Sequence, residues 1–159
     1  MEGFPDAVAA SILRVAPQDI LNLLVSAEAD LTSSLATDIL IIEDEMLIAR
    51  HLAKIVTNLG HTVIGYAATH TEAVQKIGEK MPGLILADVK LADGSLGSDA
   101  AMDIWDKVPD MPIIFITAYP DLLLSGEKKE PDFLIPKPFR PEYVQAVVSQ
   151  ALLRKTQSV

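Results

Sequence analysis

From residue 38 onward, short runs of apolar and often β-branched residues alternate with longer segments whose apolar residues recur at helical spacing. Runs of this kind favour buried strands, and strands that alternate with helices favour a parallel sheet covered on both faces. The pattern therefore predicts an α/β chain with a five-stranded parallel sheet and right-handed crossovers. The predicted strands are residues 39–42, 62–66, 84–87, 112–116 and 133–135.

The segments between and after these strands carry helix signals. Gly60 and the Pro82-Gly83 pair end two of the segments, and Pro141 opens the last one. The crossover at 121–131 is Leu-rich and then rich in Gly and charge, so we expect at most a short helix over 121–127. The predicted helices are residues 46–59, 71–81, 98–108 and 141–155.

The composition excludes several classes of function. The chain has 13 Lys and Arg against 22 Asp and Glu, for a net charge of -9. Such an acidic chain repels nucleic acid and anionic membranes. The count of cysteines is 0, which excludes disulfides, thiolate nucleophiles and Cys-based metal centres. Because we find no apolar run that could span a bilayer and no export signal, we expect a cytoplasmic protein with no nucleic-acid or membrane partner.

Polar residues follow the predicted strands at their carboxyl ends. Glu43 and Asp44 follow the first strand, Asp88 follows the third, Thr117 the fourth and Lys137 the fifth. Parallel strands bring these ends to one edge of the sheet, which is where ligands bind in such folds. Carboxylate oxygens suit Mg²⁺, and neighbouring carboxylates repel each other unless a cation offsets their charge. Lys137 can supply that charge, Asp88 can act as a carboxylate nucleophile towards a phosphoryl group, and Thr117 can donate to its oxygen.

Each of these residues also has a purely structural interpretation. The acidic triplet at 43–45 suits the first turn of a helix, and Asp88 suits a turn or a cap. Thr117 is an ordinary strand residue, and Lys137 between two prolines is an ordinary exposed residue. Four matching residue types at four strand ends nevertheless favour a shared site over four separate structural roles.

Residues 38–153 resemble response-regulator receiver domains. The motifs that carry the resemblance are Ile-Ile-Glu-Asp-Glu at 41–45, Leu-Ile-Leu-Ala-Asp at 84–88, Phe-Ile-Thr-Ala-Tyr-Pro at 115–120 and Lys-Pro-Phe at 137–139. The resemblance implies a doubly wound, flavodoxin-like fold with strand order 2-1-3-4-5. It also implies phosphorylation-dependent signalling in a two-component system or phosphorelay.

The same resemblance implies a role for each residue of the site. Asp88 would accept the phosphoryl group, and Thr117 and Lys137 would bind its oxygens. The Lys137–Pro138 bond would be cis. The Mg²⁺ ligands that the resemblance implies are Asp44, Asp88, Glu43 through water, and the backbone carbonyl of Lys90.

One departure from the receiver pattern concerns the aromatic switch residue. Receivers place an aromatic residue three positions before the Lys, but this position is Leu134, and Phe133 lies one residue earlier. A shift of one residue moves a strand side chain to the opposite face of the sheet. Tyr119, close to Thr117, is the alternative switch residue, and a surface Tyr at the turn before Pro120 is the competing interpretation.

We expect residues 1–36 to form a helical segment and residues 37–159 to form the receiver. Residues 4–31 have the helix–break–helix outline of a helix-turn-helix. Their one basic residue is Arg14, against several acidic residues, and this charge does not suit the binding of DNA. The runs Glu-Gly-Phe, Ala-Ala-Ser-Ile-Leu-Arg-Val and Ala-Glu-Ala-Asp-Leu resemble the end of the sigma-like domain of PhyR-type regulators of the alphaproteobacterial general stress response. A helical cap packed on the receiver is the simpler interpretation. We favour a truncated piece of a longer protein.

The leading hypothesis is thus a response regulator rather than an enzyme with a separate substrate. Phosphorylation of Asp88 would switch the binding of the sigma-like region to an anti-sigma factor, an anti-anti-sigma role. The expected phosphodonor is a sensor histidine kinase or a phosphotransfer protein. A phosphate-independent pseudo-receiver is the alternative. A phosphatase of the haloacid-dehalogenase type would need an Asp where Lys90 stands.

The scattered histidines His51, His61 and His70 predict no site, and we expect Trp105 to pack in the core.

Overall fold

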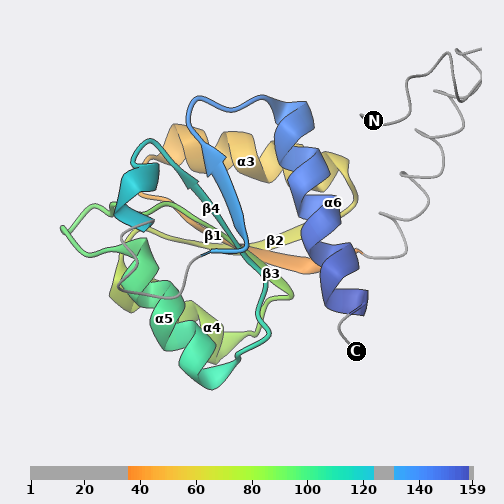
Figure 1. Cartoon of the computed structure of the whole chain (residues 1–159). Coiled ribbons are helices and arrows are strands. Elements are labelled where there is room, and N and C mark those ends of the chain that lie inside the picture. The colour runs from red at the N-terminus through yellow and green to blue at the C-terminus, as the bar shows by residue number, and fades with distance from the viewer. Residues whose placement is uncertain (1–35, 124–130, 158–159) are drawn as a thin grey trace, which may run out of the picture. The chain divides into compact units, whose positions relative to one another are not determined.

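The computed structural model describes residues 36–123 and 131–157 of the chain. Its central sheet has five strands in the order β2-β1-β3-β4-β5 (Figure 1). All neighbouring strands in it are parallel. The strands are β1 Asp38–Ile42, β2 Thr62–Ala67, β3 Leu84–Ala87, β4 Ile113–Thr117 and β5 Phe133–Pro136. The predicted strand order and doubly wound, flavodoxin-like class are confirmed.

Helices cover both faces of this sheet. Figure 1 shows α3 and α6 on one face and α4 and α5 on the other. Among the described residues, none of the helices is both long and apolar enough to cross a membrane. The helices are α3 Met46–Asn58, α4 His70–Glu79, α5 Gly97–Lys107 and α6 Pro141–Gln157.

The two faces of the sheet carry separate apolar cores because strand side chains alternate in direction. In β1, Ile39 and Ile41 pack with α3 and α6, whereas Leu40 and Ile42 pack with α4 and α5. The central strands β3 and β4 are buried along their whole length. This two-sided burial explains why their sequences are continuous apolar runs rather than alternating ones.

Local sequence signals fix where the helices begin and end. Gly60 has φ 98°, and the amides of Gly60 and His61 donate to the carbonyls of Thr57 and Val56, which closes α3 in a Schellman motif. At the start of α4, the Glu72 amide donates to Thr69 Oγ1 at 3.1 Å. The Glu72 carboxylate accepts from the Ala68 amide, so this end is a capping box shifted by one residue.

Two sequence-based expectations fall on segments that the structure describes only in part. The crossover after β4 begins with a short 3₁₀ helix, Pro120–Leu123, whose Leu123 is buried. The rest of the expected helix at 121–127 lies outside the described residues. The same holds for the helical segment expected over residues 1–36, of which residues 1–35 are not described.

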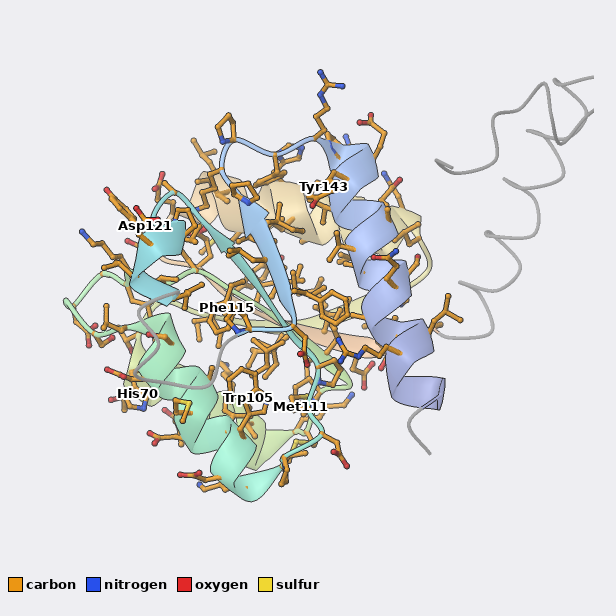
Figure 2. All side chains as sticks on the ribbon, in the orientation of Figure 1. His70, Trp105, Met111, Phe115, Asp121 and Tyr143 are labelled. Atoms are coloured by element: carbon orange, nitrogen blue, oxygen red, sulfur yellow. The ribbon has the colours of Figure 1, made fainter. Side chains whose placement is uncertain are left out.

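Trp105 of α5 is half-buried and packs against the α4–α5 core, which is the packing role expected for it (Figure 2). Its indole Nε1 donates to the carbonyl oxygen of Met111 at 2.9 Å. Its ring meets Phe115 of β4 edge-on, with 6.4 Å between the ring centroids. A buried indole needs such a hydrogen-bond partner, so Trp105 ties α5 to the start of β4.

Candidate functional site

The predicted site residues do meet at the carboxyl edge of the sheet. The Asp88 amide donates to the carbonyl of Ile42 at 2.8 Å, which extends the pairing of β1 and β3 beyond the strands. The Lys137 amide donates to the carbonyl of Thr117 at 2.9 Å, which does the same for β4 and β5. The residues that follow four strands are therefore held in register with one another by the sheet itself.

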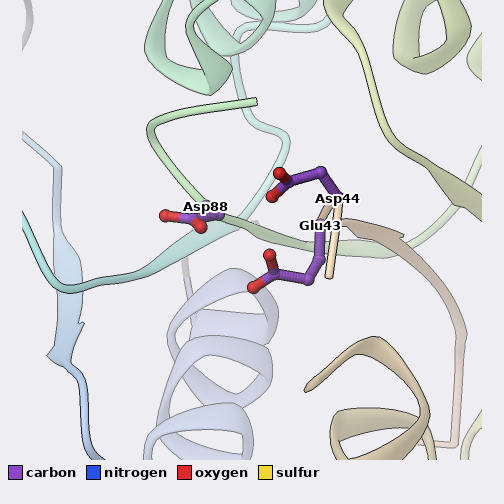
Figure 3. A group of neighbouring side chains, drawn as sticks. All are labelled: Glu43, Asp44 and Asp88. Carbon is purple, nitrogen blue, oxygen red and sulfur yellow. The ribbon is translucent and has the colours of Figure 1, made fainter. Parts of the chain in front are cut away.

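Three carboxylates form the acidic part of this site. One oxygen from each of Glu43, Asp44 and Asp88 lies within 4.8 Å of the other two (Figure 3). Glu43 and Asp88 are buried, with 3% and 8% of their surface exposed, whereas Asp44 is exposed. This group of oxygen ligands fits a hard divalent cation such as Mg²⁺, and its open side at Asp44 leaves room for the waters that Mg²⁺ retains.

Lys137 places a positive charge directly against the two buried carboxylates. Its Nζ donates to Glu43 Oε1 at 2.7 Å and to Asp88 Oδ2 at 3.0 Å. The Lys137–Pro138 peptide bond is cis, as the resemblance implied. The remaining oxygens are also bound, because Asp88 Oδ1 accepts from the Val89 amide and Glu43 Oε2 from the Glu45 amide.

Burial dominates the protonation of Glu43. Desolvation raises its pKa to about 7, and the negative charge of Asp88 adds to this, although the hydrogen bond from Lys137 opposes both. Burial is the largest single effect on the pKa of Lys137 and lowers it, but the hydrogen bonds to Glu43 and Asp88 and the negative charges of these two groups together leave that pKa raised. In the metal-free site, the ammonium therefore stays charged, whereas Glu43 takes up a proton close to neutral pH.

Thr117 and Tyr119 form the turn at the end of β4. Thr117 is fully buried, and its Oγ1 accepts a hydrogen bond from the Tyr119 amide at 3.0 Å. Tyr119 is 49% exposed, and Lys90 Nζ lies 4.1 Å from the centroid of its ring. This cation–π contact joins the residues two positions beyond Asp88 and two positions beyond Thr117.

The structure separates the two candidates for an aromatic switch. Phe133 packs with the α3–α6 core, and Arg154 lies over its ring at 5.7 Å from the centroid. Leu134 packs with the α4–α5 core, together with Phe115 of β4. Strand alternation puts Thr117 on the same face as Phe115, so Phe133 lies on the opposite face from Thr117. Tyr119 is the aromatic residue that adjoins Thr117 in this structure.

The contacts of Gly97, His70 and His61 could not be predicted from the sequence pattern. A Cβ at Gly97 would lie 1.8 Å from the carbonyl oxygen of Asp88, so only glycine permits this approach of α5 to the strand end. His70 Nε2 lies 2.6 Å from Asp103 Oδ2, and thus links α4 to α5. His61 is buried, and its Nδ1 accepts from the Thr37 amide. The turn sequence Asp93-Gly94-Ser95 is a sequence signal close to Gly97 and His70, whereas His61 lies just before β2, at the amino edge of the sheet.

Comparison with known proteins supports the motif analysis. The sequence pattern of the response regulator receiver domain matches residues 39–149. The chain belongs to the response regulator receiver family. This match includes all of the strand-end residues described above.

Relatives of this receiver include longer regulators. The phyllosphere-induced regulator PhyR of Methylorubrum extorquens is 54% identical over 153 residues, which cover 96% of this chain and 57% of that protein. The crystal structure of the response regulator PhyR from Brucella abortus has a TM-score of 0.78 and 45% identity, covering 99% of this chain and 65% of that chain. The present chain therefore spans less than two thirds of the length of these relatives.

A third similar structure contains a bound partner. It is the co-crystal structure of anti-anti-sigma factor PhyR complexed with anti-sigma factor NepR from Bartonella quintana. Its TM-score is 0.61 at 47% identity, and the match covers 96% of this chain and 63% of that one. The receiver described here is thus similar to regulators of which at least one binds an anti-sigma factor.

The raised pKa of Glu43 predicts how the stability of the metal-free receiver depends on pH. The folded protein retains a proton on Glu43 where the unfolded chain, with the ordinary value of 4.5, has lost it. This stabilisation is complete below about pH 4.5 and is lost as the pH rises through about 7. We therefore expect wild type to lose stability relative to Glu43→Gln as the pH rises from about 4.5 to about 7. Urea unfolding in the presence of a chelator measures the difference at each pH. If the free energies of unfolding of the two proteins changed with pH in the same way, the raised pKa of Glu43 would be contradicted.

Proposed function

We propose that this receiver is a phosphorylation-dependent switch in which Asp88 accepts a phosphoryl group in a Mg²⁺-dependent reaction. The observation that carries the proposal is the contact of the Lys137 ammonium with Asp88 beside two further carboxylates. The ammonium holds one oxygen of Asp88 at 3.0 Å, and a carboxylate held in this way can act as a nucleophile. An Asp with a purely structural role at a strand end would need neither a lysine ammonium nor two further carboxylates beside it.

The transfer step follows from these positions. A carboxylate oxygen of Asp88 attacks the phosphorus of the donor, a new O–P bond forms, and the bond from phosphorus to the donor's leaving group breaks. Lys137 Nζ, now 3.0 Å from Asp88 Oδ2, is within reach of an oxygen of the incoming group. The Thr117 hydroxyl would donate to a second phosphoryl oxygen.

The acidic residues would hold Mg²⁺ on the exposed side of the site. We assign its ligands to Asp44, Asp88, the backbone carbonyl of Lys90 and, through water, Glu43. A bound Mg²⁺ would neutralise charge on the phosphoryl oxygens during transfer. The chemistry that the protein catalyses would then be limited to its own phosphorylation and dephosphorylation.

We further propose that phosphorylation controls an anti-sigma factor through a sigma-like region to which residues 1–36 belong. Residues 37–159 would be the receiver. Support comes from the alignment with PhyR, which spans 153 residues and therefore extends well beyond residues 39–149. The NepR complex of the Bartonella relative indicates the class of partner. A sensor histidine kinase or phosphotransfer protein would supply the phosphoryl group.

The phosphoacceptor assignment predicts the outcome of a simple mass measurement. Incubation with Mg²⁺ and a small acyl phosphate should add one phosphoryl group to wild type and none to Asp88→Asn. Asp106→Asn is a matched control, because Asp106 is an exposed carboxylate on α5. Addition to Asp88→Asn would place the phosphoryl group elsewhere. No addition to wild type, with or without Mg²⁺, would favour a phosphate-independent pseudo-receiver.

The contact between Lys90 and Tyr119 predicts a slowly hydrolysed acyl phosphate. The paired side chains narrow the approach of water to the phosphoryl group, and Lys90 can also bind its oxygens. We expect Lys90→Ala and Tyr119→Ala each to speed the decay about two- to fivefold, the change that an exposed cation–π contact can produce. Tyr119→Phe keeps the ring and should decay like wild type. Decay followed by intact mass provides the test, and unchanged rates in both alanine variants would refute the shielding role.

The anti-sigma proposal predicts a phosphorylation-dependent interaction. Acyl phosphate and Mg²⁺ should strengthen the binding of a NepR-type anti-sigma factor to a chain that carries the whole sigma-like region. Asp88→Asn should bind at the unphosphorylated level with or without the donor. Calorimetry measures the binding of wild type and of Asp88→Asn, each with and without the donor. Equally tight binding in all four cases would show that Asp88 does not control this partner.

A further inference from the structure

The loop that joins Asp88 to α5 folds back on itself. Lys90 and Leu96 form an isolated antiparallel bridge, and the Gly97 amide donates to the carbonyl of Val89 at 2.6 Å. Gly94, with φ 82°, makes the reversal. The loop is therefore a closed hairpin whose base lies at the strand end that carries Asp88.

Ser95 makes hydrogen bonds through its carbonyl, its amide and its hydroxyl group. Its carbonyl oxygen accepts from the Leu91 amide at 3.1 Å. Its amide donates to Asp93 Oδ1 at 2.9 Å, and its hydroxyl donates to the same oxygen. The hydroxyl oxygen also accepts from the backbone amide of His70 at 3.1 Å.

The bond from His70 fastens the hairpin to a separate element of the fold. His70 is the first residue of α4, whose start is fixed by the Thr69–Glu72 capping box. A second bond nearby runs from the Ala92 amide to the carbonyl of Ala68 at 3.3 Å. The position of Ser95 is therefore set by α4 as well as by its own loop.

This arrangement fixes the direction of the Lys90 carbonyl. The carbonyl of Lys90 and the amide of Leu91 belong to one planar peptide group, in which N–H and C=O point in opposite directions when the bond is trans. Lys137–Pro138 is the one cis bond found in the described part of the chain, so the Lys90–Leu91 bond is trans. When Ser95 holds the Leu91 amide, the Lys90 carbonyl is turned to the other side of the hairpin.

We propose that Ser95 is a positioning residue for cation binding: tethered to α4 through its hydroxyl, it holds the Lys90–Leu91 peptide plane so that the Lys90 carbonyl is preset as a ligand. This inference rests on the proposed Mg²⁺ site. A preset carbonyl binds the cation without a further loss of backbone freedom, so the tether raises affinity although Ser95 itself does not touch the ion.

The test compares Ser95→Ala with Ser95→Thr, which retains the hydroxyl. Calorimetric Mg²⁺ titration should show about fivefold weaker affinity for Ser95→Ala, the change expected from one lost hydrogen bond, and near wild-type affinity for Ser95→Thr. In the metal-free protein, hydrogen exchange at the Leu91 amide should be faster in Ser95→Ala only. Thr57→Ala is the matched control, since it removes an exposed hydroxyl whose bond to the Lys54 carbonyl lies within α3.

The outcomes separate this inference from the function on which it rests. If wild type binds Mg²⁺ and Ser95→Ala binds it equally well, the positioning role is wrong and the metal site stands. If wild type does not bind Mg²⁺, both are wrong. A third outcome is that Ser95→Ala loses both thermal stability and Mg²⁺ affinity, and that Ser95→Thr does not recover the Mg²⁺ affinity. In that case Ser95 supports the fold and does not position the carbonyl.

Discussion

The repulsion among three carboxylates at one edge of the sheet is the constraint around which this receiver is built. Two of these groups, Glu43 and Asp88, are almost fully buried, where a pair of like charges is unfavourable by several kcal/mol. Lys137 lies within hydrogen-bond distance of both and offsets much of that repulsion. Its ammonium comes from the far side of the sheet, beyond β4, so the balance of charge exists only in the folded chain.

The strand order makes this balance possible. Glu43 and Asp88 follow β1 and β3, which are neighbours in the sheet although they are separated by a whole strand and two helices in the sequence. Thr117 ends β4 and Lys137 follows β5, and these two strands continue the sheet on the other side of β3. Asp88 thus stands at the centre of the edge, with acids on one side and the cation and hydroxyl on the other.

Burial divides the site into a fixed and an accessible half. Glu43, Asp88 and Thr117 are held by the core and by backbone hydrogen bonds, so their geometry is preset. Asp44, Lys90 and Tyr119 are exposed. The proposed phosphodonor and cation would approach from the exposed half, without opening the core. The hairpin at 88–97 carries Asp88 of the fixed half and Lys90 of the accessible half, and hydrogen bonds attach it to the start of α4.

The sequence by itself determined the class of fold and indicated the candidate site residues. Continuous apolar runs such as Leu84–Ala87 and the polar residues directly after them are local signals, and parallel strands bring such ends together by geometry alone. The roles of Ser95, Gly97 and His70 could not be predicted in this way, because each depends on a neighbour that only folding brings near. Tertiary structure likewise decided that Phe133 faces away from Thr117 and that Lys90 pairs with Tyr119. It also raised the pKa of Glu43, because desolvation depends on burial, and burial is a property of the packed chain rather than of any residue in it.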